Sequence, residues 1–270
     1  MNEPFLSGKT ALITGSTQGI GLAIAIRLAQ AGAAIVLHGL ATPAQAAEAE
    51  AATRAAGTKD VCFFDTDLRN PVAIDSMMNA ALAWTGHIDV LVNNAGIQFT
   101  APLVDILPER WDAIIGVNLS AAFYTMRRAL PGMLERVFGR IVNLASVHGL
   151  VASKNKAAYV ASKFGLVGLT RAVALECASA GSQSSGGVTA NCIAPGWTET
   201  AIIQPQVVAR AASLGADREA ALRDLLREKE PSLRMSQPSE IAEAVAMLCQ
   251  SWAHNLTGVT LPVDGGWTTQ

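Results

Sequence analysis

The sequence predicts an α/β protein in which about seven strands form a single-domain, doubly wound parallel sheet with helices on both faces. Short apolar runs alternate from end to end with longer segments of helical apolar spacing. The runs, such as Ala34–Leu37, are continuously apolar, which is typical of parallel strands buried on both faces. A glycine-rich turn, Gly15–Gly21, also joins the first strand to the first helix.

Length, charge and cysteine content limit the possible functions. The 270 residues are 50% hydrophobic, and no composition break marks a second domain, so we expect one domain over 1–270. A net charge of −2 without a basic block gives no reason to expect nucleic acid or a membrane surface. The N-terminal segment does not have the pattern of a signal sequence, and no apolar stretch looks long and uninterrupted enough to span a bilayer. Four scattered cysteines without a CxxC pair indicate buried free thiols rather than disulfides or a metal site, so we expect a cytoplasmic protein.

The first strand, Lys9–Thr14, runs into the glycine turn, and a helix is expected over Leu22–Ala31. Strand, glycine turn and helix together form a phosphate cradle, in which Gly15 and Gly19 let the backbone approach a pyrophosphate and Gly21 lets helix and strand pack closely. The alternative is a tight turn without a ligand. The spacing G-x-x-x-G-x-G differs from the common dinucleotide fingerprint.

The second strand, Ala34–Leu37, precedes an alanine-rich helix over Pro43–Ala56. An acid at the end of this strand favours NAD, and a basic group favours NADP. Here His38-Gly39-Leu40-Ala41 offers neither, no Lys or Arg follows before Arg54, and Ser16 in the turn is neutral. NAD is therefore expected by default.

Polar side chains follow the next two strands. Val61–Phe64 ends in Asp65–Leu68, where Asp67 is either a ligand-binding carboxylate or the N-cap of the helix Pro71–Trp84. Asp89–Asn93 ends in Asn93–Gly96, small and amide residues that suggest backbone held close to a ligand. One long helix from Pro108 to about Leu130 then carries Asn118, either as a local structural group or as part of a nearby site.

The fifth strand, Arg140–Leu144, delivers Ser146, and the following helix extends through Tyr159 to about Ala178. Tyr159 and Lys163 lie four residues apart, so both share one helix face. An ammonium beside a phenol stabilises the phenolate and lowers its pKa, which suits acid–base chemistry. Taken alone, the pair also fits a solvated helix face.

After the flexible loop 180–187, Val188–Ile193 forms a sixth strand that ends at Ala194–Trp197. Residues 198–238 then depart from the pattern with two amphipathic helices, Val207–Leu214 and Arg218–Glu228, which form either a closing lid or a solvated appendage. A helix over Ser239–Leu248 and a last strand over Val259–Val263 complete the chain, with Pro262 tolerable only near an edge.

Several of these features together resemble the short-chain dehydrogenase/reductase family. They are Thr14-Gly15-x-x-x-Gly19-Ile20-Gly21, Asp67, Asn93-Asn94-Ala95-Gly96, Asn118, Ser146, Tyr159-x-x-x-Lys163 and Pro195-Gly196, in the family's order over nearly the whole chain. Within the family the chain most resembles the bacterial D-3-hydroxybutyrate dehydrogenases, on the stretches 93–98, 111–121, 146–163, 195–197, 228–233 and 263–267.

The resemblance implies a homotetramer of Rossmann-type subunits that interconverts D-3-hydroxybutyrate and acetoacetate with NAD. It implies that Tyr159 is the general base, Lys163 lowers its pKa and binds the nicotinamide ribose, Ser146 orients the substrate oxygen, and Asn118 supports a proton relay. The implied cofactor-binding residues are Gly15, Thr17, Gly19, Ile20, Asp67, Leu68, Asn94, Gly96, Tyr159, Lys163, Pro195, Gly196 and Thr198. No metal is expected.

A hydroxy acid also presents a carboxylate, which requires cationic or amide donors. Lys156 lies one helical turn before Tyr159, so both can face one cavity. Gln98 and His148 flank the catalytic groups, the resemblance adds Gln206 from the lid, and Trp197 and Trp267 would wall the apolar side. Ordinary surface charge is the alternative for Lys156 and His148.

Three departures and two rival functions remain. His38-Gly39-Leu40 replaces the expected Asn-Gly-Phe-like segment, Phe99 replaces a polar residue, and the loop 180–187 is longer than usual and is expected to lie away from the site. A 3-oxoacyl-thioester reductase would need NADPH, against which Ser16 and 38–41 argue. A non-catalytic NAD-binding protein would show a defect among the four catalytic positions, and none is visible.

Overall fold

The computed structural model describes residues 4–181 and 186–269 of the chain. The glycine- and serine-rich loop 180–187 is therefore described only at its ends. The prediction that this loop is flexible and lies away from the site falls, for Ser182–Ser185, outside the described residues.

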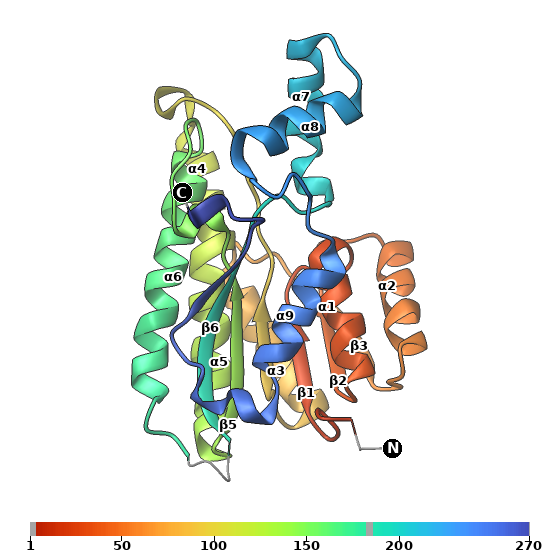
Figure 1. Cartoon of the computed structure of the whole chain (residues 1–270). Helices are drawn as coiled ribbons and strands as arrows, with labels where there is room; N and C mark the ends of the chain where they lie inside the picture. The colour runs from red at the N-terminus through yellow and green to blue at the C-terminus, as the bar shows by residue number, and fades with distance from the viewer. Residues whose placement is uncertain (1–3, 182–185, 270) are drawn as a thin grey trace.

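The seven predicted strands form one parallel sheet, as expected (Figure 1). The strand order is β3-β2-β1-β4-β5-β6-β7, so the order reverses between β1 and β4. In open α/β sheets, ligands bind at such a switch point, outside the carboxyl ends of the strands. The strands are β1 Thr10–Ile13, β2 Ala34–His38, β3 Val61–Phe64, β4 Val90–Asn93, β5 Phe138–Leu144, β6 Gly187–Pro195 and β7 Thr260–Val263.

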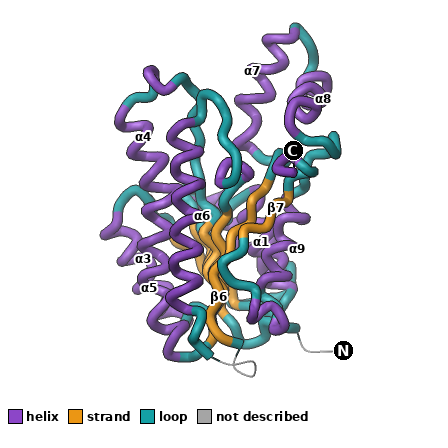
Figure 2. Tube along the Cα trace, turned by 60° about the vertical axis from the view of Figure 1, so that its left-hand side comes forward, coloured by secondary structure: helices purple, strands orange, loops and turns teal. Residues whose placement is uncertain are grey.

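Helices cover both faces of the sheet (Figure 2). Alternate strand residues supply the two cores: Ile13 packs with α1, α2 and α9 on one face, whereas Leu12 packs with α3, α5 and α6 on the other. The helices are α1 Gly19–Gln30, α2 Pro43–Ala55, α3 Pro71–Thr85, α4 Pro108–Ile115, α5 Ala121–Glu135, α6 Ala157–Cys177, α7 Gln204–Leu214, α8 Arg218–Lys229 and α9 Pro238–Leu248.

Local sequence sets most helix ends. Pro43 and Pro71 begin α2 and α3, where Thr42 and Asn70 accept hydrogen bonds from the first turn. Asn70 is thus the N-cap of α3, and the alternative role of Asp67 as that cap is wrong. The helix α1 begins at Gly19 rather than Leu22, so the glycine turn is shorter than predicted.

The expectation of one regular helix from Pro108 to about Leu130 is wrong. A π-helical turn, Gly116–Ser120, separates α4 from α5, and α5 continues to Glu135 despite Pro131. Asn118 lies in this turn and is almost fully buried, with its amide bonded to the backbone of Ile97. The π-helical turn thus coincides with the residue whose side chain binds a loop distant in sequence. Such turns are frequent at functional sites.

The last strand accommodates Pro262 because β7 is the edge of the sheet and pairs only with β6. A proline at an edge removes no ladder hydrogen bond from a central pairing. The position of this proline agrees with the expectation from sequence.

One helix among the described residues, α6, is long and apolar enough to cross a membrane by length and composition alone. The expectation that no stretch meets that test is therefore wrong. Half of the apolar window is buried in the protein, where Leu166 and Val173 pack in the core beneath α6. The same helix carries Tyr159 and Lys163.

Residues 198–238 fold back over the end of the sheet where the strands finish, and α7 and α8 stand together there (Figure 1). They share an apolar cluster with the loops below: Val207 and Leu225 pack with Val147, Trp197 and Trp267. The segment is therefore packed onto the body of the protein, and the alternative of a solvated appendage does not describe it.

Candidate functional site

A cavity of about 690 Å³ opens at the carboxyl ends of the strands, beneath α7. Every predicted site residue except Asn118 lines it. These are Gly15, Thr17, Gly19, Ile20, Asp67, Leu68, Asn94, Gly96, Gln98, Ser146, His148, Lys156, Tyr159, Lys163, Pro195, Gly196, Trp197, Thr198, Gln206 and Trp267. The fold thus brings together residues that are up to 252 positions apart, from Gly15 to Trp267.

The glycine turn needs glycine for close backbone approach. A Cβ on Gly21 would lie 2.1 Å from the carbonyl oxygen of Gly15, and one on Gly15 would lie 2.9 Å from the Cα of Ala95. Gly15 also has φ +63°, which L side chains rarely adopt. The bare backbone leaves the N-terminus of α1 open to the cavity, where a pyrophosphate fits.

Asn94 fixes this turn from the neighbouring strand. Its Nδ2 donates to the carbonyl oxygens of Thr14 and Gly15, each at 2.9 Å, while the Thr14 hydroxyl oxygen accepts from the Asn94 and Ala95 N–H groups at 3.0 Å. Both hydrogen bonds of the Asn94 side-chain NH₂ group therefore stabilise the glycine turn. Asn94 shapes the cavity through the backbone that it places.

The adenosine end of the cavity is lined by Gly39, Leu40 and the Asp67–Arg69 segment. The Ser16 hydroxyl donates to the Ile13 carbonyl at 2.8 Å and is buried, so it does not face the cavity as a donor. Arg69 does reach the cavity, which the search for cations near the second strand missed. Its guanidinium donates to both carboxylate oxygens of Asp67, from Nε to Oδ1 at 2.9 Å and from Nη2 to Oδ2 at 2.5 Å, and this lowers the pKa of Asp67.

Tyr159, Ser146 and Lys163 meet at the other end of the cavity. Tyr159 and Lys163 lie on one face of α6, with the Lys163 Nζ 5.7 Å from the Tyr159 ring centroid and 2.6 Å from the Leu144 carbonyl oxygen. Ser146 follows β5 and its Oγ accepts from the His148 N–H at 3.2 Å. All three side chains are nearly buried, so they form one water-poor corner of the cavity.

The pKa of Tyr159 departs from expectation. Burial raises it above the ordinary value of a phenol, and the hydrogen bond with Ser146 acts weakly in the opposite direction. Burial also lowers the pKa of Lys163 to about 8. The protein alone therefore raises rather than lowers the pKa of Tyr159, because loss of hydration outweighs the hydrogen bond with Ser146.

Asn118 lies behind this corner, outside the cavity lining. Its Oδ1 accepts from the Ile97 N–H at 2.8 Å, and its Nδ2 donates to the Ile97 carbonyl at 3.0 Å and to the Ser162 hydroxyl at 3.1 Å. These bonds fix the loop that carries Gly96 and Gln98 against α6. Asn118 thus has the structural role that the sequence left open as one alternative. A role in proton relay remains a proposal.

The predicted substrate residues form an aromatic and cationic wall beside Tyr159. Trp197 and Trp267 stack with ring centroids 6.2 Å apart, and the His148 ring lies edge-on to Trp267 at 5.5 Å and to Tyr159 at 6.0 Å. The Lys156 Nζ lies 5.6 Å from the Trp197 ring and 3.4 Å from the His148 Nε2. Lys156 is thus enclosed in the wall of the cavity and is not an ordinary surface charge.

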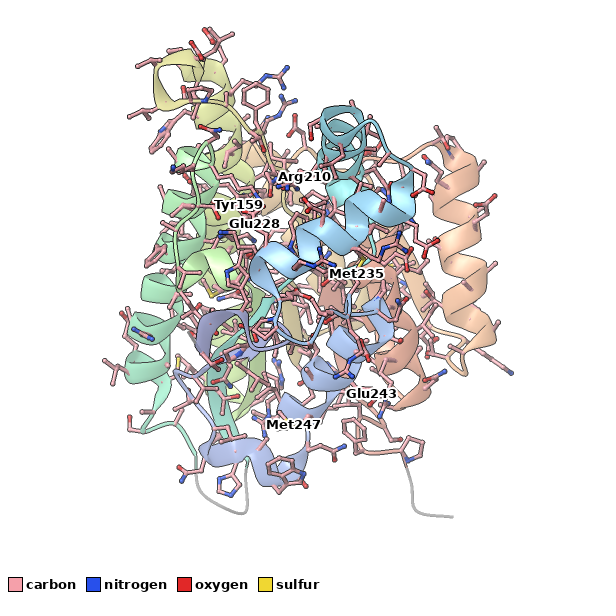
Figure 3. The ribbon with its side chains drawn as sticks, turned by 45° about the horizontal axis from the view of Figure 1, so that its top comes forward. Tyr159, Arg210, Glu228, Met235, Glu243 and Met247 are labelled. Carbon is pink, nitrogen blue, oxygen red and sulfur yellow. The ribbon has the colours of Figure 1, made fainter. Side chains whose placement is uncertain are left out.

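Gln206 reaches the cavity from the first turn of α7, which begins three residues earlier than predicted. Arg210 on the same helix binds Asp224 at 2.5 Å and Glu228 at 2.6 Å on α8 (Figure 3). These ion pairs and the shared apolar cluster hold α7 and α8 together. The two helices consequently form one unit above the cavity.

Sequence reasoning missed Glu230, just beyond α8. Its Oε1 accepts from the Trp197 N–H, its Oε2 is buried without a hydrogen-bond partner, and burial raises its pKa to about 7. A Cβ on Gly196 would lie 2.3 Å from Oε1, so the glycine is needed for this contact. The acid was hidden in a run of charged residues that resembled a solvated helix end.

Sequence reasoning also missed Arg110 on α4, which lines the cavity and stacks 5.5 Å from the Phe99 ring. Since α4 follows a long irregular segment, no periodic signal connects Arg110 with the strand ends. Among the described residues no cluster of three His, Cys, Asp or Glu side chains could hold a metal ion.

Known proteins resemble this chain both in sequence and in fold. A sequence profile of the short chain dehydrogenases matches residues 9–210. A D-beta-hydroxybutyrate dehydrogenase from Cupriavidus necator is 48% identical, covering 98% of this chain and 100% of that protein. One of the same name from Rhizobium meliloti is 42% identical, covering 97% and 99%.

The same fold is found in a crystal structure from Agrobacterium tumefaciens, described as a candidate gluconate dehydrogenase. It has a TM-score of 0.85 and 32% sequence identity, and the match covers 100% of each chain. Profile, relatives and fold agree on the family. The chain belongs to the short-chain dehydrogenase family, whose members are enzymes that act on small molecules with a nicotinamide cofactor.

Proposed function

We propose that this enzyme oxidises D-3-hydroxybutyrate to acetoacetate with NAD⁺, in a reversible reaction. The observation that carries the proposal is the position of Lys156. Its ammonium lies in the cavity wall between the catalytic corner and two stacked tryptophans, with His148 at 3.4 Å. A short substrate with a hydroxyl at one end and a carboxylate at the other fits this pairing of a proton acceptor with a cation.

The residues of the corner take the following roles in the proposal. Ser146 and Tyr159 bind the substrate hydroxyl, and Tyr159 takes its proton through Oη. Lys163 supplies positive charge beside the phenol and favours the phenolate as it forms. The nicotinamide ring, when bound, accepts the hydride from C3 of the substrate.

Asn118 keeps the Gly96–Gln98 loop and α6 in place, and we assign it the support of the proton relay behind Lys163. Gln98, on the loop after β4, and Gln206, on α7, both line the cavity and supply amide donors to the carboxylate.

NAD⁺ rather than NADP⁺ is proposed because the adenosine end offers no free cation among the described cavity-lining residues. Arg69 is paired with Asp67, Ser16 bonds to Ile13, and Gly39 and Leu40 contribute no charge. A 2′-phosphate at this end would lie near the Asp67 carboxylate, which is paired with Arg69, and near the apolar side chain of Leu40.

An initial-rate panel tests the proposal. D- and L-3-hydroxybutyrate, short alcohols and a 3-oxoacyl thioester are compared with NAD(H) and NADP(H). The expected result is turnover with the D isomer and NAD⁺ alone at substantial rate. Equal rates for both isomers, or activity only with NADPH and the thioester, would contradict the proposal.

We also propose that the enzyme is a cytoplasmic homotetramer. The four cysteines are free, as expected in a reducing compartment. A mostly apolar groove of about 300 Å³ lies on the outer faces of α5 and α6, lined by Phe123, Leu130, Leu134 and Leu169 among others. Light scattering after size exclusion tests the assembly, and a monomer at micromolar concentration would contradict it.

A further inference from the structure

The imidazole of His38 lies beneath the cofactor end of the cavity and contacts two other loops. The Gly15 N–H donates to its Nδ1 at 3.2 Å, and its Nε2 lies 2.9 Å from the Thr66 carbonyl oxygen. Because a carbonyl only accepts, Nε2 carries the hydrogen, and Nδ1 keeps the lone pair that Gly15 needs. The two contacts together assign a neutral ring in the Nε2–H tautomer.

These contacts join three loops that follow three adjacent strands. Gly15 follows β1, His38 ends β2, and Thr66 follows β3. Backbone bonds strengthen the first junction: the His38 N–H donates to the Ser16 hydroxyl at 2.9 Å, and the Ser16 N–H donates to the His38 carbonyl at 2.8 Å. No other described side chain is hydrogen-bonded to the backbone after both β1 and β3.

Each joined loop forms part of the cavity lining. Gly15 belongs to the phosphate cradle, and Thr66 is followed by Asp67 and Leu68 at the adenosine end. His38 is 2% exposed, so water cannot readily replace either hydrogen bond if the ring is removed. The relative position of cradle and adenosine loop therefore depends on this ring.

Protonation would disrupt the arrangement. A proton on Nδ1 would place two donors, Nδ1–H and the Gly15 N–H, face to face. Burial lowers the pKa of His38, while the Thr66 carbonyl and the Asp65 carboxylate on the β3 loop oppose that shift. Asp67 lies on the same loop with its carboxylate engaged by Arg69.

We propose that His38 is the positioning residue of the dinucleotide site, and that it makes cofactor affinity depend on a proton without taking part in hydride transfer. His38 lines the cavity but is almost fully buried, so it acts through its contacts with Gly15 and Thr66. The inference rests on the family's nicotinamide cofactor and not on the identity of the hydroxy acid.

The test compares His38→Asn with His38→Leu. Asn can keep an acceptor near the position of Nδ1 but does not titrate, whereas Leu removes both hydrogen bonds. At pH 7.5 we expect Leu to weaken NADH binding about ten- to a hundredfold, because both hydrogen bonds are lost, and Asn to retain affinity within about threefold. The kcat at saturating cofactor should change less than about twofold in both variants.

The pH profile of NADH binding separates positioning from mere folding. Once the pH falls below the lowered pKa of His38, the wild-type Kd should rise with acidity and approach a tenfold change per pH unit, while the Kd of the Asn variant stays flat. His254→Asn, a change on the 3₁₀ segment Ser251–Asn255 outside the cavity lining, is the matched control and should keep the wild-type slope. Equal slopes in wild type and His38→Asn would overturn the proposal.

A second measurement holds even if the Leu variant does not fold. ¹⁵N chemical shifts of the wild-type imidazole at pH 7.5 should show a protonated Nε2 and an unprotonated Nδ1, as the contacts require. The opposite tautomer, or a charged ring, would overturn the assignment. Unchanged NADH affinity in a folded His38→Leu protein would do the same.

Discussion

The Lys156 Nζ lies 3.4 Å from the His148 Nε2, while the His148 Nδ1 faces the Val151 carbonyl oxygen at 3.3 Å. Since the carbonyl accepts, Nδ1 carries the hydrogen, and Nε2 is left to accept from the lysine. Burial and the nearby lysine lower the pKa of His148 to about 4, so the ring is neutral at pH 7. Lys156 alone therefore supplies positive charge at this wall, and His148 orients it.

Replacing Lys156 by Ala should raise the KM for D-3-hydroxybutyrate about 10- to 100-fold, because a hydrogen bond to a charged group contributes about 1.5–3 kcal/mol. The KM for NAD⁺ should change little, since Lys156 lies at the substrate end. Lys154→Ala, a change at a nearby exposed lysine, is the control. An unchanged substrate KM in Lys156→Ala would remove the lysine from its role.

The substrate KM should also depend on pH. Burial, followed by the charge of Lys229, lowers the pKa of Lys156 from 10.5 to about 8. Carboxylate binding needs the protonated amine, so the KM should be constant below pH 8 and rise up to about tenfold per pH unit above it. Lys163, whose pKa is also about 8, is present in wild type and in Lys156→Arg and affects both alike. The contribution of Lys156 is therefore the excess rise in KM of wild type over Lys156→Arg between pH 8 and 9.5. The same rise in both would assign the effect elsewhere.

Tyr159→Phe should lower kcat by about 10²–10⁴-fold, since the variant loses only the titratable hydroxyl of the general base. NADH affinity, measured by fluorescence titration, should remain near the wild-type value because the ring still fills its place. Retained turnover in the folded variant would show that another group accepts the proton.

Gly21→Ala should weaken NADH binding at least about tenfold. Its Cβ would lie 2.1 Å from the Gly15 carbonyl oxygen and 2.5 Å from the Asn94 Nδ2, so the cradle must move. Gly168→Ala is the matched control, because a Cβ there meets nothing within 4 Å and alanine favours the helix by up to about 1 kcal/mol. Wild-type affinity in Gly21→Ala would show that the turn does not bind the cofactor.

Glu230→Gln should flatten the pH dependence of stability between pH 5 and 8. The folded-state pKa of Glu230 is raised from 4.5 to about 7, so the folded protein binds more protons than the unfolded chain between these values. The contribution of the Glu230 carboxyl to the wild-type free energy of unfolding should therefore decrease as pH rises from 4.5 to 7, by at most about 3 kcal/mol. Urea unfolding at pH 5 and 8 measures the difference, and parallel losses in both proteins would contradict it.

The strands and the glycine turn were predictable because local apolar runs and glycine spacing specify them. The sequence could predict which residues form the catalytic corner, because Ser146 follows a strand and Tyr159 and Lys163 share one helix face. Other features depend on contacts distant in sequence: Asn118 reaches Ile97, His38 reaches Gly15 and Thr66, and Glu230 reaches Trp197. The direction of the Tyr159 pKa could not be inferred, because it depends on burial.

The π-helical turn at Gly116–Ser120 changes the phase of one continuous helical segment. An α-helix advances about 100° per residue, so one extra residue turns everything after it by about that angle. Arg110 and Ala113 face the cavity before the change, whereas Thr125 and Ala129 face the core after it. The continuous segment from α4 through the π-helical turn to α5 thus faces the cavity with its first part and the core with its second. The rotation at the turn links the shape of the cofactor cavity to the packing against the sheet.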